Sequence, residues 1–335
     1  MVIRRSRRSR LGRTTMCGRK AARLVAFLAA AATGCAAVAP RATEQDGPCP
    51  PGATLKATRS TDNHELACVI ISATGEEILH GAWAVWYPEG RPKIMGRFIE
   101  GVADGWFHAW YPEGEPMRSG RYERGLRQGT WSHWHRCGQL AEVCEWQAGK
   151  RHGSIERRWP RGSPRERGQY FMGEMDGVWL RWFEDGRRES ETGWKLGMRH
   201  GLSRSFFPDG GVEMEMSFEA GRPHGRSTRY FQSGNPKAAI EWRHGRVHGR
   251  VRLWYDGGPI RRQLEFVQDS RHGDFVSWHP NGVRAMAGTF HHDQPHGLWI
   301  QWDEAGEEIY RGRYEEGRLI EGADILGPAL VREGP

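Results

Sequence analysis

Glycine recurs every 24 residues through most of this chain. The spacing is kept with no insertion at ten lead glycines: Gly81, Gly105, Gly129, Gly153, Gly177, Gly201, Gly225, Gly249, Gly273 and Gly297. A register held through ten copies indicates tandem units that pack on one another in the same way. We therefore expect a solenoid of repeats, not a compact globule with a single core.

Each 24-residue unit has the sequence pattern of a β-hairpin. Numbering each unit from its lead glycine as position 0, a second glycine stands at position 9 in every copy. A third stands at position 20 in eight copies and is replaced by Asp269 and Asp293 in the others. Between them lie short runs rich in aromatic residues and valine, which are typical of strands bounded by turns. The sequence thus predicts an all-β fold, an elongated single-layer antiparallel sheet of tandem β-hairpins with about twenty strands.

Positions 2 and 17 carry the predicted core. We expect these two positions to lie directly opposite each other across both kinds of turn, which would give one row of side chains across the sheet. Sixteen of its twenty members are aromatic. In chain order the row is Trp83, Phe98, Phe107, Tyr122, Trp131, Trp146, Ile155, Tyr170, Trp179, Trp194, Ser203, Phe218, Ser227, Trp242, Val251, Phe266, Phe275, Phe290, Trp299 and Tyr314.

Position 5 forms a second row of side chains, and its residue is aromatic in nine of the ten copies. Side-chain alternation places it on the face opposite position 2, unless a bulge intervenes. Two interpretations remain open: a stripe covered by the long side chains beside it, or an exposed recognition face for a partner. The tryptophans of this row are the candidate binding residues: Trp86, Trp110, Trp134, Trp182, Trp254, Trp278 and Trp302.

The pattern Gly-x-Trp-x-x-Trp-Tyr-Pro-x-Gly followed by Gly-x-Tyr-x-x-Gly, as in Gly81 to Gly101 and Gly105 to Gly125 with Phe at one aromatic position of each, resembles the MORN repeat in its bacterial variant form. The resemblance covers residues 78–317 in ten copies. It implies a twisted single-layer sheet of hairpins that is used for protein or membrane association. Some variant members of the family are described as antitoxins, but no motif in this chain carries that role.

The N-terminal 34 residues resemble a bacterial lipoprotein signal. They contain nine Lys or Arg and no acidic residue, then an apolar run from Leu24 to Ala32, then small residues before Cys35. Such a run is too short to span a bilayer as a helix. We expect residues 1–34 to be removed, Cys35 to be lipidated, and the chain to be anchored in the outer membrane facing the periplasm. Met1 and Met16 are both candidate starts.

Cleavage changes the charge of the protein. The whole chain has 49 basic and 41 acidic residues, and nine of the basic ones lie in the signal. Their removal leaves 40 basic and 41 acidic residues, so the positive net charge of the whole chain comes from the signal. Because nucleic-acid binding needs a surplus of positive charge, we expect no nucleic-acid partner.

Four cysteines follow Cys35, and an even number in an exported protein favours disulfides. We expect Cys49 and Cys68 to pair and to hold an N-terminal tether and cap, residues 35–77. Cys137 and Cys144 form a second candidate pair, although they are not directly opposite in the predicted register. Residues 318–335 are expected to form a C-terminal cap.

Seven histidines precede a lead glycine, and strand spacing places them about 9.6 Å apart, too far for two of them to share a metal ion. His291 and His292, with His296, are the one local cluster of ligand types, and we expect a polar turn there instead of a metal site. No nucleophile motif or phosphate loop interrupts the repeats. We therefore expect no catalysis and no cofactor.

These features favour a non-catalytic envelope lipoprotein whose sheet is a protein-binding or scaffold surface. One alternative is an antitoxin-like or immunity protein that captures a single toxin. A second is glycan or peptidoglycan binding through the position 5 tryptophans. Scaffold and immunity protein differ in their number of partners, whereas glycan binding predicts loss of retention when Trp110 or Trp278 becomes alanine.

Overall fold

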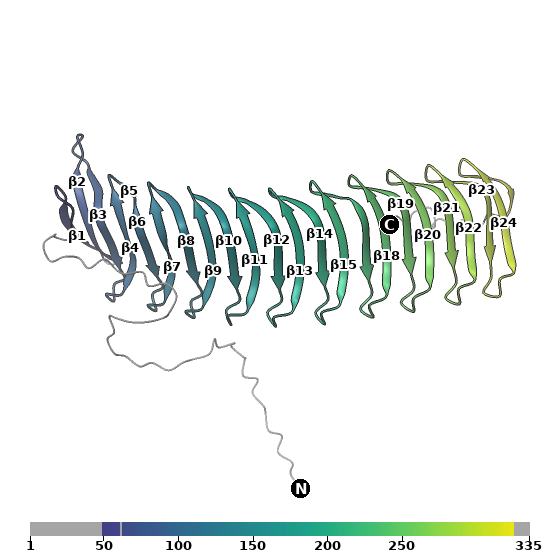
Figure 1. The fold of residues 1–335 in the computed structure, drawn as a ribbon, viewed down its shortest axis with the longest axis horizontal. Helices are drawn as coiled ribbons and strands as arrows, with labels where there is room; N and C mark the ends of the chain where they lie inside the picture. The colour runs from purple at the N-terminus through teal and green to yellow at the C-terminus, as the bar shows by residue number, and fades with distance from the viewer. Residues whose placement is uncertain (1–48, 61, 325–335) are drawn as a thin grey trace, which may run out of the picture. The chain divides into compact units, whose positions relative to one another are not determined.

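The structure is a computed structural model that describes residues 49–60 and 62–324. Within these ranges the chain forms 25 β-strands in one antiparallel sheet and no helix. The described residues therefore include no helix that is long and apolar enough to cross a membrane. Strands that follow each other in sequence pair with each other, so the sheet is a series of consecutive hairpins (Figure 1). The predicted all-β sheet of tandem hairpins is confirmed.

The strands follow the repeat. Two strands precede it, β1 (Thr54–Arg59) and β2 (His64–Ile71). The ten hairpins are β3 (Glu77–Trp86) with β4 (Pro92–Ile99), β6 (Gly105–Trp110) with β7 (Pro116–Glu123), β8 (Leu126–Trp134) with β9 (Leu140–Gln147), β10 (Lys150–Arg158) with β11 (Pro164–Phe171), β12 (Glu174–Trp182) with β13 (Arg188–Lys195), β14 (Met198–Phe206) with β15 (Val212–Glu219), β17 (Gly225–Tyr230) with β18 (Pro236–Arg243), β19 (Arg246–Trp254) with β20 (Ile260–Val267), β21 (Ser270–Trp278) with β22 (Arg284–His291), and β23 (Gln294–Trp302) with β24 (Glu308–Glu315).

The strand number exceeds the predicted twenty by five. Two of the additional strands are β1 and β2, and two are short pieces, β5 (Val102–Ala103) and β16 (Arg222–Pro223). The fifth is β25 (Arg318–Gly322), which pairs with β24 and adds one strand after the last repeat. Residues 325–335 of the expected C-terminal cap lie outside the described residues.

The sheet divides into two units. The first holds the described residues up to Leu126, with residues 132–141 and 160–162. The second holds residues 127–131, 142–159 and everything described from Ser163 onward. Each unit contains complete hairpins.

The turns between hairpins use left-handed backbone at two successive residues. In the first of them Glu100 has φ 47° and Gly101 has φ 80°, and the flanking residues Ile99 and Val102 pair. Two successive positive φ angles define a type I′ turn, whose twist suits a two-residue hairpin. The non-glycine residue at position 19 has a positive φ in all ten copies. Asp can also adopt this conformation, which explains why Asp269 and Asp293 replace glycine at position 20.

The predicted strand register is wrong by two residues. Trp83 at position 2 faces Gly96 at position 15, and Phe98 at position 17 faces Gly81. Position 2 meets position 15 across the other turn as well, as in the pair of Phe275 with Leu264. The register shifts close to both turns, at bulges that turn lengths alone did not reveal. Positions 2 and 17 are therefore diagonal neighbours and not directly opposed.

The aromatic rings nevertheless pack against one another as the core. In the first unit the rings of Trp83 and Phe98 lie 5.6 Å apart in an edge-to-face arrangement, and Phe107 and Tyr122 repeat this at 5.7 Å. Diagonal neighbours in a sheet are within reach of aromatic side chains. Such contacts contribute roughly 0.5–1.5 kcal/mol each beyond burial.

The second unit has two buried clusters made mainly from the same positions, with position 15 added. One centres on Cys144, Ile155 and Trp179. The larger one includes Val251, Phe266, Phe275, Phe290, Trp299 and Tyr314, and Trp299 is fully buried. Where serine replaces the aromatic residue, its hydroxyl is satisfied: Ser227 accepts a hydrogen bond of 2.8 Å from the Trp242 indole. The core is a line of such clusters along one face of the sheet.

Hydrogen bonds from several of the position 6 side chains join a hairpin to the next one. In the first unit the Tyr87 hydroxyl donates to the carbonyl of Trp110, and the Tyr111 hydroxyl donates to the carbonyl of Trp134, both at 2.9 Å. In the second unit Tyr255 makes the same bond to Trp278. These bonds cross from one copy to its successor, so they fix the spacing between hairpins at the Pro-x-Gly end of the strands.

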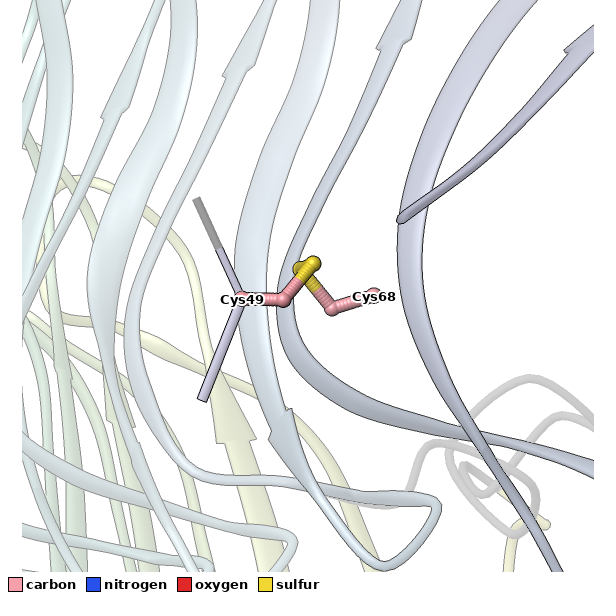
Figure 2. The surroundings of a disulfide bond; sticks show 2 residues. All are labelled: Cys49 and Cys68. Carbon is pink, nitrogen blue, oxygen red and sulfur yellow. A yellow bond between two sulfur atoms is a disulfide. The ribbon is translucent and has the colours of Figure 1, made fainter. Parts of the chain in front are cut away.

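The predicted Cys49–Cys68 disulfide is present at the start of the sheet (Figure 2). The two Cα atoms are 5.4 Å apart and Cys68, on β2, is buried. Pro50 packs so closely on Gly81, the first lead glycine, that a Cβ there would overlap the proline ring. The disulfide therefore holds residues 49–53 against the first repeat.

Candidate functional site

The position 5 aromatic row is neither buried nor exposed. All seven candidate tryptophans are half-buried: Trp86, Trp110, Trp134, Trp182, Trp254, Trp278 and Trp302. A bulge does occur beside this position, between Val85 and Trp86 for instance, but it places the additional residue in the second strand of the hairpin. The row consequently remains on the face opposite position 2.

Charged side chains cover part of this row. In the second unit the guanidinium groups of Arg167 and Arg188 lie 5.7 Å and 5.3 Å from the centroid of the Trp182 ring. Arg167 also pairs with Glu156 at 3.3 Å on the neighbouring strand. Arginine over an indole face is a favourable cation–π arrangement. Trp182 is thus held in a layer of arginine and carboxylate groups.

The most open aromatic group lies on β6 in the first unit. Trp106, His108 and Trp110 alternate along this strand and share its second face. The Trp106 and His108 rings are 6.4 Å apart and nearly parallel, and His108 lies 5.9 Å from Trp110. Burial lowers the pKa of His108, so the imidazole is neutral at pH 7. Trp106, 55% exposed, stands at position 1 and was not among the residues predicted from the sequence.

A second exposed apolar group surrounds the turns that follow β11 and β13 in the second unit. We call it the turn patch, and its six side chains are between 42% and 55% exposed: Phe171, Met172, Val178, Leu196, Met198 and Leu202. Sequence reasoning missed it because these positions lie outside the aromatic rows. The signal was present as large apolar residues in copies 4 to 6 at positions that are polar in several other copies.

The remaining candidate cysteines do not form the second disulfide. Cys137 and Cys144 are both free thiols. Cys137 is exposed in the turn after β8, where its thiol donates to the carbonyl of Pro160. Cys144 points into the core beside Ile155 and Trp179. The prediction of a Cys137–Cys144 bond is therefore wrong, because one side chain faces solvent and the other faces the core. Cys35 lies outside the described residues.

Residues just before the lead glycine have a structural role in the early repeats. The His80 Nδ1 accepts a hydrogen bond of 3.3 Å from the Glu100 backbone N–H, and His152 Nδ1 does the same for Met172. Asp104 offers a carboxylate oxygen to the N–H of Arg124 in the same place. An acceptor is needed here because the positive φ residue of the turn otherwise leaves its N–H unpaired. This supports the interpretation of the recurring histidines as turn residues.

The histidines of the ninth repeat are arranged differently. His291 and His292 lie beside His272, which precedes the lead glycine of that copy. Their ring centroids are between 4.5 Å and 5.1 Å apart, whereas His296 lies 5.9 Å from His291. Desolvation and the charges of His292, His272 and His296 lower the pKa of His291. The structure thus replaces His296 by His272 as the third member of the predicted cluster.

Comparison with known proteins identifies one of these repeats. The model of the MORN repeat variant family matches residues 199–220, which cover most of β14 and β15. None of the curated proteins matches the chain at a significant level. The chain therefore carries a MORN repeat of the variant type, and its tandem hairpin sheet is suited to act as a binding or scaffold surface.

Proposed function

We propose that this protein is a non-catalytic lipoprotein of the bacterial cell envelope that binds proteins through its repeat sheet. We also propose that all ten 24-residue units are MORN repeats. The matched repeat, the single-layer sheet and the equal spacing of the copies support this extension. A surface built from identical hairpins offers the same backbone many times, which suits attachment of an extended partner.

The turn patch is the observation that carries the protein-binding proposal. Its six large apolar side chains come from adjacent copies, and each is nearly half exposed or more. Contiguous exposed apolar residues on a soluble face typically mark an interaction surface. Position 1 is charged in copies 7 to 9, with Asp274 in the ninth, and is Leu298 in the tenth. Binding would therefore centre on copies 4 to 6.

Photo-crosslinking in the native envelope tests this. A photoreactive amino acid is placed at Val178 in one variant and at Asp274 in another, which are the same repeat position. We expect protein adducts from Val178 and none above background from Asp274. Equal yields at both positions, or no adduct at Val178, would contradict the proposal. A single stoichiometric adduct at Val178 would instead favour the immunity-protein alternative.

Glycan or peptidoglycan binding is the second candidate, and the aromatic group on β6 favours it. The rings of Trp106, His108 and Trp110 form a row on one face of β6, and Trp106 at its end is exposed. Aromatic rings pack well against the apolar faces of sugars. If this function operates through the β6 group and not through the whole position 5 row, Trp106→Ala with Trp110→Ala abolishes retention on purified peptidoglycan. Trp278→Ala then leaves retention unchanged, in contrast to the expectation from the row alone. Retention of the double variant would exclude the β6 group as the glycan site.

The envelope location rests on the signal-like sequence and on Cys35. A single acyl chain binds membranes only weakly, whereas a lipoprotein anchor supplies several. Cys35→Ser should therefore move the protein from the membrane fraction to the soluble periplasmic fraction. Membrane retention of the Cys35→Ser variant would argue against lipid anchoring through this residue.

A further inference from the structure

Three imidazole groups converge where β21 begins and β22 ends, which is the end of this hairpin opposite its own turn. His272 stands on β21, His291 is the last residue of β22, and His292 is the next residue in the turn. One nitrogen from each ring lies within 4.8 Å of one nitrogen from each of the others. His272 is half-buried, while His291 and His292 are exposed. The group is thus preformed on a rigid strand pair and open to solvent on one side.

His272 does not have the role of His80 and His152. In copies 1 and 4 the equivalent Nδ1 accepts a backbone N–H from the turn. In copy 9 the carboxylate of Asp293 accepts hydrogen bonds from the Ser270 hydroxyl and the Arg271 N–H at the start of β21. The Nδ1 of His272 is then buried with no hydrogen-bond partner among the described residues. A buried nitrogen without a partner is destabilising unless something binds it.

We propose that His272, His291 and His292 bind a divalent transition metal ion of the Zn²⁺, Ni²⁺ or Cu²⁺ class. Imidazole nitrogen is a preferred ligand of these ions and a poor one for Mg²⁺ or Ca²⁺. Nitrogens around a tetrahedral Zn²⁺ at about 2.1 Å are about 3.4 Å apart. The nitrogens now lie within 4.8 Å of one another, so binding requires them to close by up to about 1.4 Å, which rotation of the two exposed rings would provide.

The site has three protein ligands and an open fourth position. The Asp293 carboxylate is engaged by Arg271 and Ser270, so it is not free to complete the coordination. Water or a side chain from a bound partner would take the fourth place, as in zinc sites that retain an exchangeable ligand. The ion would also join the end of β22 to β21 and stiffen the turn of the ninth repeat.

The fourth repeat supplies a matched control. Its residues at the three equivalent positions are His152, Phe171 and Met172. His152 already uses its Nδ1 for the Met172 N–H and lies against the Phe171 ring. Only one imidazole is present, so this turn has the same fold without the metal-binding group. A second group, Glu219 with His224 and His244, offers a competing site that the experiment must separate.

Zinc competition against a chromogenic chelator tests the proposal on the full-length, tag-free protein in detergent. Three proteins are compared with wild type: His291→Gln with His292→Asn, His152→Gln, and His244→Asn. Asparagine is used at positions 292 and 244 because it tolerates the positive φ found there. Circular dichroism verifies that each variant keeps its sheet. Loss of outer-shell partners weakens metal affinity by roughly 10–100-fold, and loss of two direct ligands should weaken it by at least that factor.

We expect wild type to bind Zn²⁺ and His291→Gln with His292→Asn to lose one equivalent or weaken by about 100-fold or more. His152→Gln should match wild type. Visible absorption of Co²⁺-loaded wild type should show tetrahedral coordination that the double variant lacks. The proposal is overturned if wild type binds no Zn²⁺ at micromolar concentration. It is equally overturned if the double variant binds as wild type does, or if only His244→Asn reduces binding.

Discussion

At the scale of single residues, burial separates the two free cysteines. Burial raises the pKa of the Cys144 thiol to about 11, and Cys144 is 1% exposed. Cys137 is exposed in a turn. Since the thiolate is the reactive form, a buried thiol with a raised pKa reacts slowly at neutral pH.

Alkylation should therefore discriminate between them. With iodoacetamide at pH 7.5 we expect Cys137 to be modified quickly and Cys144 to remain unmodified in the folded protein. Peptide mass spectrometry after timed quenching measures both. In denaturant the two residues should react alike, which provides the control. Rapid modification of Cys144 in native conditions would mean that its core cluster opens readily.

The pair of Arg271 and Asp293 makes a pH-dependent contribution to stability. Arg271 is 7% exposed, and its Nε lies 3.1 Å from the Asp293 carboxylate. Desolvation alone would raise the pKa of Asp293, but hydrogen bonds from Arg271 and Ser270 outweigh it, and the pKa lies below its ordinary value. A depressed carboxylate pKa stabilises the fold above the unfolded value, about 3.9. That stabilisation is lost as the pH falls through the folded pKa.

We expect Asp293→Asn to destabilise the ninth repeat by about 1–2 kcal/mol at pH 7, because a buried guanidinium loses a carboxylate contact. The difference from wild type should shrink as the pH falls below about 3.9 and through the lowered pKa of Asp293. Hydrogen exchange of residues 270–296 at pH 7 and at pH 3 measures it. Asp269→Asn is the matched control, since the Arg246–Asp269 contact is a longer, exposed one of 4.0 Å. An equal effect at pH 3 and pH 7 would rule out the charge as its origin.

At the scale of the hairpin, position 15 determines how closely two copies approach. Leu264 and Cys144 stand there in two copies, and glycine in several others. In the second unit a Cβ at Gly288 would overlap the indole carbons of Trp299. At Gly96 in the first unit the nearest atom to such a Cβ is a Phe107 carbon at 3.7 Å, an ordinary contact. Alanine at position 15 would therefore clash in the hairpin of Gly288 and fit in the hairpin of Gly96.

Gly288→Ala should destabilise its hairpin by roughly 1–3 kcal/mol, the usual consequence of overpacking a filled core. Gly96→Ala should change stability by less than about 0.5 kcal/mol. Local hydrogen exchange in β22–β23 and in β4–β6 measures each effect where it arises. Equal responses of the two variants would mean that backbone freedom, and not the neighbouring ring, explains glycine at position 15.

At the scale of the whole molecule, each copy contacts mainly its immediate neighbours. Strand pairs follow chain order, and position 6 side chains bond only to the next copy. In such a repeat array, stability is close to a sum of local terms. A substitution that destabilises one end of the repeat array should therefore leave the stability of the other end unchanged.

Removing the disulfide tests this locality. Cys49→Ala with Cys68→Ala opens a loop with a sequence separation of 19, worth about 3 kcal/mol. We expect faster hydrogen exchange in β1, β2 and β3, and no change in β20 through β24. A uniform loss of protection along the chain would instead show that the repeats unfold as one cooperative unit.

Much of the fold could be predicted because it depends on local chemistry repeated ten times. Glycine and polar residues at fixed positions specify the turns, and aromatic residues at positions 2 and 17 specify the buried face. The register could not be predicted, since it depends on bulges whose presence leaves the residue pattern unchanged. The turn patch was missed for a related reason: Val178 and Leu202 become a surface only when neighbouring turns are placed side by side.

The sequence by itself determined the period, the hairpin and the face that is buried, because each follows from the preferences of residues within one 24-residue unit. Only the tertiary structure decided which side chains from different strands meet. His272 and His291 are 19 residues apart in the chain, yet antiparallel pairing of β21 with β22 places them side by side. Cys137 and Cys144 are close in the chain, yet one faces solvent and the other the core. Cross-strand contacts depend on register, and register is a property of the assembled sheet.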